Sequence, residues 1–135
     1  MQFGLCCDLG NVSVAAEAGA DYGEWTVDGM LLPNASDEAF QDVLASLRSA
    51  PLSFPVVRGF VPANLKVTGS DVDTTVLKAY AEKTLKRAEQ AGVDTIVWGS
   101  GKSRRVPEGF DPQRAYEQLV TFGRMVGTAA HCCPK

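Results

Sequence analysis

The chain has 135 residues, of which 45% are hydrophobic and 21% are charged, and its formal net charge is −3. This composition is typical of a globular domain with one hydrophobic core and argues against a disordered or fibrous chain. Because acidic and basic residues are interspersed, no broad field attracts nucleic acid or an anionic membrane. No segment approaches the roughly 20 apolar residues that span a bilayer, and residues 1–8 lack the basic start of a signal peptide. We therefore expect a cytoplasmic protein that has neither nucleic acid nor a membrane as its partner.

Two strand–helix units are predicted first. In order, they are a strand over residues 2–7, a short helix over residues 11–18, a strand over residues 20–26 and, after a loop, a helix over residues 39–47. Asn11 is the expected N-cap of the short helix, and Gly19 ends it. Ser36 is a good N-cap for the longer helix, whose apolar residues recur at helical spacing.

Two further units follow. They are a strand over residues 53–60, a helix over residues 72–91, a strand over residues 93–98 and a helix that Asp111 caps and Pro112 begins. The apolar stripes of the two helices are Val76, Leu77, Tyr80, Leu85 and Ala88, and then Ala115, Leu119, Phe122 and Val126. Charged residues occupy the other side of the 72–91 helix, and Gly92 ends it. The nearly continuous apolar run at residues 93–98 is typical of a strand covered on both faces.

Alternation of strands and helices predicts a parallel sheet with right-handed crossovers. No linker divides the chain, so residues 1–135 form one α/β domain. TIM barrels carry eight such units in about 250 residues, and four units amount to half of one. We therefore expect a parallel (βα)4 half of a TIM barrel, truncated after its fourth helix, with strand order 1-2-3-4. The alternative is an open doubly wound sheet, in which the strand order reverses.

The segment from Ile96 to Ser103 is similar to a phosphate-binding P-loop but departs from it twice. Ile96 stands where the motif requires its first glycine. Pro107 follows closely, where the motif requires a helix. Nucleotide hydrolysis is therefore not expected. Lys102, Arg104 and Arg105 leave two readings open, which are a site for a phosphate or carboxylate and a set of solvated loop charges.

The four cysteines lie in two adjacent pairs, Cys6-Cys7 and Cys132-Cys133. Neighbouring cysteines seldom bridge each other, so we expect buried, reduced thiols. His131, Cys132 and Cys133 are ligand-type side chains, but they lack the two-residue spacers of zinc motifs. A metal site there is the less favoured reading.

Six segments, in order, carry a resemblance to a known family. They are FGLCCD (residues 3–8), AEAGADYGE (16–24), FVPANLKVTG (60–69), RAEQAGV (87–93), IVWGSG (96–101) and VPEGF (106–110). Together they resemble the first half of the xylose isomerase-like superfamily of sugar phosphate isomerases and epimerases. The resemblance implies a TIM barrel, a divalent metal (Mn²⁺, Mg²⁺, Co²⁺ or Zn²⁺) and proton transfer between adjacent sugar carbons through an enediolate. It also implies that the metal ligands belong to the second half of the barrel, so this chain alone should be inactive and hold no metal.

Side chains at the strand ends and in the following loops are the candidates for binding a sugar or sugar phosphate. They are Glu24, Arg58, Asn64, Lys66, Trp98, Ser100, Gly101 and Arg104. Glu24 has two readings, as an acceptor for sugar hydroxyls and as the ion-pair partner of Arg58. Trp25 and Trp98 either stack on a sugar or, as we favour, pack in the core. Catalytic residues are not assigned.

Two rival functions remain beside the isomerase or epimerase. One is a sugar-binding or small-anion-binding α/β module without catalysis. The other is a zinc-dependent endonuclease for abasic DNA, from the same superfamily, which the net acidity and the single histidine disfavour. A half-barrel also has two open sheet edges and a bare inner face. We therefore expect self-association, including closure of two halves into eight strands, or low stability as a monomer.

Overall fold

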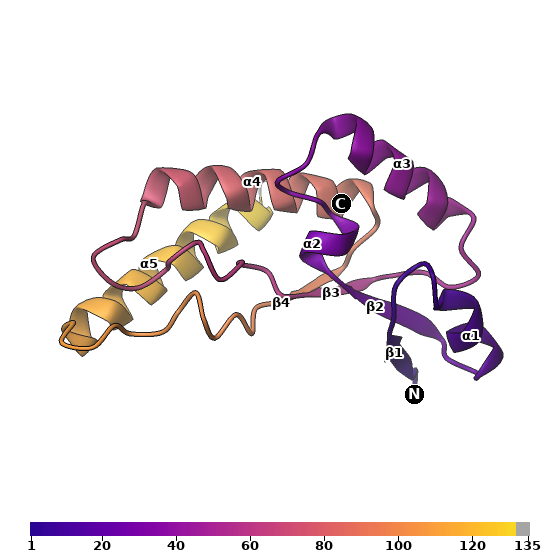
Figure 1. Cartoon of the computed structure of the whole chain (residues 1–135), viewed down its shortest axis with the longest axis horizontal. Coiled ribbons are helices and arrows are strands. Elements are labelled where there is room, and N and C mark those ends of the chain that lie inside the picture. The colour runs from indigo at the N-terminus through magenta and orange to yellow at the C-terminus, as the bar shows by residue number, and fades with distance from the viewer. Residues whose placement is uncertain (132–135) are drawn as a thin grey trace.

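The computed structural model describes residues 1–131 as four strands and five helices (Figure 1). The strands are β1 (Gly4–Cys6), β2 (Tyr22–Thr26), β3 (Val56–Arg58) and β4 (Thr95–Val97). The helices are α1 (Val12–Glu17), α2 (Val27–Met30), α3 (Asp37–Arg48), α4 (Thr74–Gln90) and α5 (Pro112–His131). None of these helices combines the length and apolarity needed to cross a bilayer.

All four strands are parallel and lie in the order β1-β2-β3-β4. The predicted α/β class and sequential strand order are therefore confirmed, and the order excludes the doubly wound alternative. Crossovers between parallel strands are right-handed in nearly all proteins, so strands in chain order gather their helices on one face. Helices α2, α3 and α4 accordingly lie on the same side of the strands (Figure 1).

The strand register divides the side chains between two faces, because successive residues of a strand point to opposite sides. The helix-covered face consists of Leu5, Gly23, Trp25, Val57 and Ile96. The uncovered face consists of Gly4, Cys6, Tyr22, Glu24, Thr26, Val56, Arg58, Thr95 and Val97. The burial of β4 shows the difference: Ile96 is half-buried, whereas Val97 is 44% exposed. The prediction that residues 93–98 are covered on both faces is therefore wrong, because every helix that follows a strand lies on the other side.

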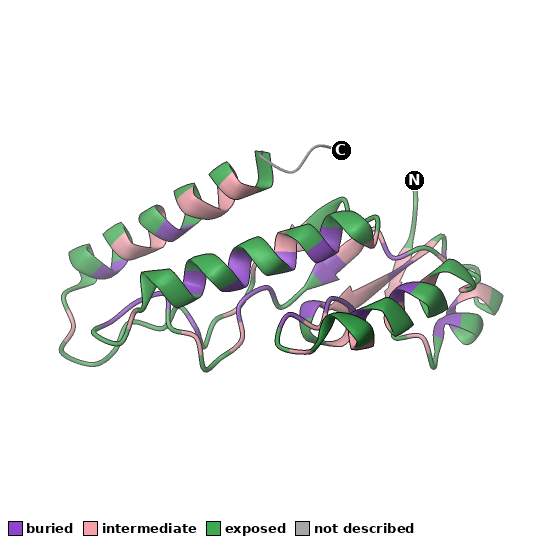
Figure 2. Cartoon of the chain, turned by 90° about the horizontal axis from the view of Figure 1, so that it is seen from above, coloured by how far each residue is buried: buried purple, intermediate pink, exposed green. Residues whose placement is uncertain are grey.

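Two core clusters hold the helices in place. The first joins the covered face to α1, α2, α3 and the end of α4, with Val57, Phe40 and Met30 almost fully buried. The second lies beyond the sheet, where α4 and α5 pack on the loop between β3 and α4, and it includes Phe60, Val67 and Phe122. Figure 2 shows a line of buried residues along α4, whereas α5 carries only a few.

Arg87 in α4 is a buried charge that fixes the turn between α2 and α3. It is 3% exposed, and its guanidinium lies 4.8 Å from the centre of the Phe40 ring. It donates to the backbone carbonyl oxygens of Leu31, Leu32, Ala35 and Ser36 and to Oδ1 of Asp37, at 2.6 Å. Its hydrogen bond, and then its charge, lower the pKa of Asp37. A carboxyl with a lowered pKa stabilises the fold above its ordinary value of 3.8, and this contribution is lost as the pH falls below that value.

The structure corrects three predictions about individual residues of the helices. Arg87 was expected on the charged side of α4, but it is buried, and Val76, expected in the apolar stripe, is 45% exposed. Asn11 occupies the N-cap position of α1, but its side chain makes no capping hydrogen bond. Its backbone and side-chain nitrogens both donate to Asp8 Oδ1, at 3.1 and 2.9 Å.

Helix α2 was not predicted, although Thr26 caps it by accepting from the Gly29 amide. The caps expected at Ser36 and Asp111 are confirmed.

Gly23 provides the first testable prediction for the fold. A Cβ atom at this position would lie 2.4 Å from the Phe54 ring, inside the first core cluster. Gly23→Ala should therefore lower the free energy of unfolding by about 2 kcal/mol, as overpacking of a core typically does. Urea denaturation measures the loss. Gly99→Ala is the matched control, because a Cβ there meets nothing within 4 Å, and an equal loss in both variants would contradict the clash.

Arg87 provides the second prediction. Arg87→Met leaves the carbonyl oxygens of the α2–α3 turn without donors, so we expect a loss of about 3 kcal/mol in the free energy of unfolding. Arg48→Met changes an exposed arginine at the end of α3 and should stay within about 0.5 kcal/mol of the parent chain. Urea unfolding of both variants compares the two sites. A loss at Arg87 no larger than that at Arg48 would show that the turn holds without this side chain.

Candidate functional site

A polar cluster lies on the uncovered face, close to the carboxyl ends of three neighbouring strands. Cys6 and Arg58 are the last residues of β1 and β3, and Glu24 lies in β2 between them. Glu24 Oε1 accepts from Cys6 Sγ at 3.6 Å and forms an ion pair with Arg58 Nε at 3.3 Å. Because the carboxyl ends of parallel strands meet at one edge, chain order alone brings these three side chains together.

This cluster, which we call the Glu24 cluster, remains open to solvent. The Arg58 side chain is 48% exposed and that of Glu24 is 26% exposed. An ion pair at this exposure adds little stability, so its placement is not explained by the energy of the fold. Both contacts engage Oε1, which leaves Oε2 as an acceptor for a ligand hydroxyl. The predicted ion pair between Glu24 and Arg58 is confirmed, while the binding of sugar hydroxyls stays a prediction.

The two cysteines of the N-terminal pair differ in environment. Cys6 is exposed in the Glu24 cluster, and Cys7 is half-buried against the first core. The expectation of buried thiols is therefore wrong for Cys6, because it projects from the face that no helix covers. Burial raises the pKa of the Cys7 thiol, and the negative charge of Asp8 raises it further. Both thiols are free, as predicted.

Two long loops leave the same edge of the sheet and are joined side by side. They are the β3–α4 loop (residues 59–73) and the β4–α5 loop (residues 98–111). The Val61 amide donates to Ser100 Oγ at 3.0 Å, the Val67 amide to the Ser103 carbonyl at 2.8 Å, and Thr68 Oγ1 to the Arg105 carbonyl at 2.9 Å. These bonds make the two loops one layer beside the Glu24 cluster.

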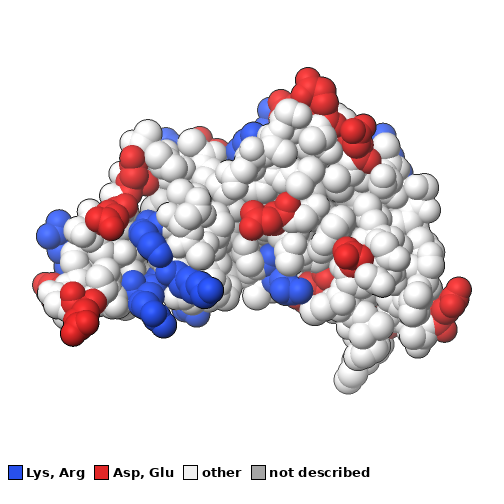
Figure 3. Space-filling view, in the orientation of Figure 1, with Lys and Arg blue, Asp and Glu red and all other residues white. Residues whose placement is uncertain are grey.

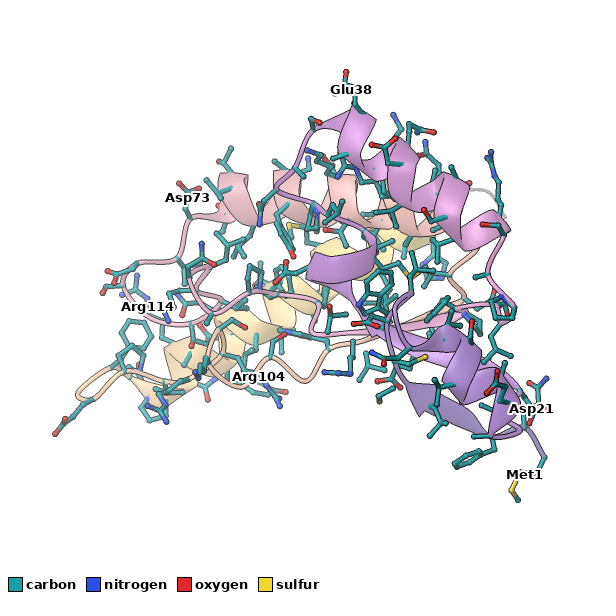
Figure 4. All side chains as sticks on the ribbon, turned by 45° about the vertical axis from the view of Figure 1, so that its right-hand side comes forward. Met1, Asp21, Glu38, Asp73, Arg104 and Arg114 are labelled. Carbon is teal, nitrogen blue, oxygen red and sulfur yellow. The ribbon has the colours of Figure 1, made fainter. Side chains whose placement is uncertain are left out.

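Basic side chains gather over this loop layer. The two loops contain Lys66, Lys102, Arg104 and Arg105, all exposed, and Figure 3 shows a group of Lys and Arg side chains on this part of the molecule. Lys66 Nζ donates to the carbonyls of Ala63, at 2.7 Å, and Lys102, at 3.4 Å. Arg104 Nε donates to the Gly99 carbonyl at 3.0 Å. In Figure 4, Arg104 lies at the lower border of the molecule, away from α3 and α4.

The β4–α5 loop does not form a P-loop, in agreement with the sequence analysis. Lys102 lies in a turn, and the next helix begins only at Pro112. The amides of Ser103 and Arg104 donate to the Ser100 carbonyl, which takes them out of use for a phosphate. Neither of these two amides is therefore a candidate for binding an anion, whereas the charged side chains of the loop are.

The candidate residues fall into two groups and a remainder. Glu24 and Arg58 meet in the Glu24 cluster, and Lys66, Ser100 and Arg104 lie in the loop layer. Asn64 and Gly101 are exposed on the two loops. Trp98 packs edge-on against Phe122, with ring centres 4.9 Å apart, and Trp25 packs against Phe54 at 5.9 Å. Both tryptophans are thus core aromatics, which is the reading the sequence favoured.

Sequence reasoning missed the residues that join the loops. Thr68 is 1% exposed, and its Oγ1 donates to the Arg105 carbonyl of the other loop. Ser103 is fully buried. Its carbonyl accepts from the Val67 amide of the other loop, while its hydroxyl donates to the Ser100 carbonyl of its own loop. Small hydroxyl side chains in loops give no periodic pattern. The available hint was that Ser and Thr often satisfy backbone groups in irregular segments.

The described residues offer few clustered donors for a metal ion. Residues 1–131 bring together no group of three or more His, Cys, Asp or Glu side chains suited to a metal ion. Within this range the Glu24 cluster offers one carboxylate and one thiol, which do not make up a metal site by themselves. His131 is exposed at the end of α5, with Nδ1 2.6 Å from the Gly127 carbonyl. Cys132 and Cys133 lie outside the described residues.

Ser100 provides a prediction for the loop layer. Ser100→Ala removes the acceptor of the Val61 amide, so hydrogen exchange of that amide should accelerate about fivefold, the equivalent of ~1 kcal/mol. Exchange followed by NMR reads out this single amide. Ser13→Ala, at an exposed position in α1, is the control and should leave it unchanged. An unchanged exchange rate in Ser100→Ala would mean that other contacts protect Val61.

No protein-family model matches this chain, and none of the curated proteins is a match. The resemblance described from the six sequence segments therefore rests on those residues alone. The features that bear on function are the uncovered face, the Glu24 cluster and the loop layer.

Proposed function

We propose that the chain forms a (βα)4 half of a TIM barrel and supplies the substrate-binding wall of a metal-dependent sugar (phosphate) isomerase or epimerase. The carrying observation is the Glu24 cluster, a solvated carboxylate, guanidinium and thiol on the uncovered face at the carboxyl ends of the strands. In TIM barrels this end of the sheet binds the substrate. The sequential strand order and the six sequence segments support the same proposal.

In this proposal the Glu24 cluster binds the sugar hydroxyls, and the loop layer binds the phosphate. Glu24 accepts hydrogen bonds from sugar hydroxyls through Oε2, and Arg58 holds the carboxylate through Oε1. Lys102 and Arg105 meet the phosphate, since both are exposed on the adjacent loop and carry the charge that a phosphate requires. A hydroxyl-binding region thus lies next to a phosphate-binding region, which is the arrangement a sugar phosphate needs.

The chemistry of proton transfer comes from outside these residues in this proposal. The divalent metal that the resemblance implies would, if bound by residues outside this set, supply polarisation of the sugar oxygens. Residues 1–131 bring together no ligand set for such a metal, and the resemblance assigns the ligands to the second half of the barrel. This chain's own residues bind and orient the sugar. We accordingly expect no turnover from the purified 135-residue chain.

The non-catalytic alternative, a sugar-binding or anion-binding module, rests on the same observation. It shares the Glu24 cluster and the loop layer and differs only in having no catalytic partner. Binding experiments therefore test what both functions require, and turnover experiments separate them.

The test is an NMR titration of the chain with a panel of aldose and ketose phosphates, their parent sugars and inorganic phosphate. We expect shifts in the amides of β2, β3 and the loop layer, with the sugar phosphates bound most tightly. Glu24→Gln removes a charge-assisted acceptor and should weaken binding about tenfold. Glu17→Gln, at an exposed position in α1, is the control and should bind like the parent chain.

Three results would count against the proposal. They are the absence of binding by every sugar phosphate, equal binding by Glu24→Gln and the parent chain, and shifts confined to surfaces away from β2 and β3. Turnover of ketose phosphates with added Mn²⁺ would instead show that the metal ligands lie within this chain.

A further inference from the structure

An apolar groove runs along the β4 edge of the sheet. It has a volume of about 680 Å³ between α4, α5 and β4. Its apolar lining includes Phe60, Ala88, Val93, Ile96, Trp98 and Val126. Gly92, Val93 and Asp94, which lead into β4, also line it. The groove therefore reaches the amino end of that strand. It belongs to the helix-covered side of the sheet and is distinct from the Glu24 cluster.

The opposite edge of the sheet presents the complementary feature. Phe3 directly precedes β1 and is 63% exposed, and Met1 is fully exposed. The Phe3 amide donates to Asp21 Oδ2 at 2.7 Å, and its carbonyl accepts from the Asp21 amide at 2.8 Å. Both bonds anchor the backbone of Phe3 to the start of β2. By alternation with Gly4 and Leu5, its ring belongs to the helix-covered side, and Figure 4 shows Met1 projecting from this end beside Asp21.

We propose that the groove is occupied by the N-terminal edge of a second copy of this chain. The β1 strand of each copy pairs in parallel with β4 of the other, and Phe3 enters the groove beneath α5. A two-fold axis along the strands relates the copies, so each uses the same two edges and the assembly closes as a dimer. The eight strands then have no open edge.

Three observations favour this occupant over an unrelated partner. Parallel pairing sets the amino ends of two strands side by side, and both Phe3 and the groove lie at amino ends. The protruding aromatic residue and the apolar groove occur on the same side of the sheet at opposite edges, as closure by a second copy requires. Closure also covers Val97, which is 44% exposed.

Charge gives no obstacle to closure. Glu24 is already paired with Arg58 in the same copy, so the uncovered face brings no unpaired charge into the interior. The inference does not depend on the proposed function, because it uses the sheet edges and the groove and makes no use of a ligand. In the closed dimer, the two Glu24 clusters share one mouth of the barrel.

Sedimentation equilibrium of the full chain, without ligand, tests the proposal. We expect a dimer, with the dissociation constant raised at least about tenfold by Phe3→Asp, since truncating a central interface aromatic commonly has that effect. Tyr116→Asp replaces another exposed aromatic residue, 62% exposed near the start of α5, and should not change the constant.

A second variant tests the groove from its other side. Gly127 lines the groove, and a Cβ there meets nothing within 4 Å. Gly127→Leu should therefore fill the groove, favour the helix and weaken the dimer about tenfold without unfolding the chain. A wild-type chain that stays monomeric at every concentration tested would overturn the proposal. So would dimerisation unchanged in both Phe3→Asp and Gly127→Leu, or open-ended growth beyond the dimer. Sugar phosphate binding is measured separately, so the two proposals can fail independently.

Discussion

Placement of all crossover helices on one side of the sheet is the constraint on which the rest of this structure depends. Parallel strands in chain order, joined by right-handed crossovers, leave the second face without cover. The covered face is apolar and builds the first core, with Val57 fully buried. The uncovered face keeps Glu24 and Arg58 in contact with water. The same topology thus builds the core on one side and leaves a solvated polar face on the other.

Two sets of polar contacts hold segments of the chain that lie outside the sheet. Arg87 ties the turn between α2 and α3 to α4, and its burial is tolerated because its donors meet carbonyl oxygens and Asp37. The β3–α4 and β4–α5 loops are tied to each other by the bonds of Val61 and Val67 with Ser100 and Ser103. Both sets of contacts stabilise irregular backbone near the carboxyl ends of the strands. These bonds therefore give a defined position to the backbone that carries the basic side chains of the loop layer.

The features that could be predicted from the sequence are those that depend on local chemistry or on the order of the elements. Alternating apolar runs and helical segments were enough for the class and the strand order, because crossover handedness allows few arrangements. Caps at Ser36 and Asp111 followed from short-range chemistry. The Glu24–Arg58 pair followed from two polar residues at the ends of neighbouring strands.

The remaining features depend on contacts that no local pattern encodes. Arg87 was misplaced because a charged residue within a helix is usually solvated, and its partner Asp37 lies 50 residues away. The Val61–Ser100 and Thr68–Arg105 bonds span 39 and 37 residues. Burial of β4 was overestimated because an apolar run does not reveal which of its faces meets a helix. In each case the decisive partner comes from another element of the fold.

The distribution of side chains across the uncovered face supports the closure into a barrel that we propose. The row nearest the amino ends of the strands contains Gly4 and Tyr22, and the Tyr22 ring fills the space that a side chain at Gly4 would need. Charge begins only in the following rows, with Glu24 and Arg58. In a closed barrel, rows that still reach water tolerate ionised groups better than fully packed rows do. This gradient supports the proposed closure, with the Glu24–Arg58 pair in the part of the face nearer the carboxyl ends of the strands.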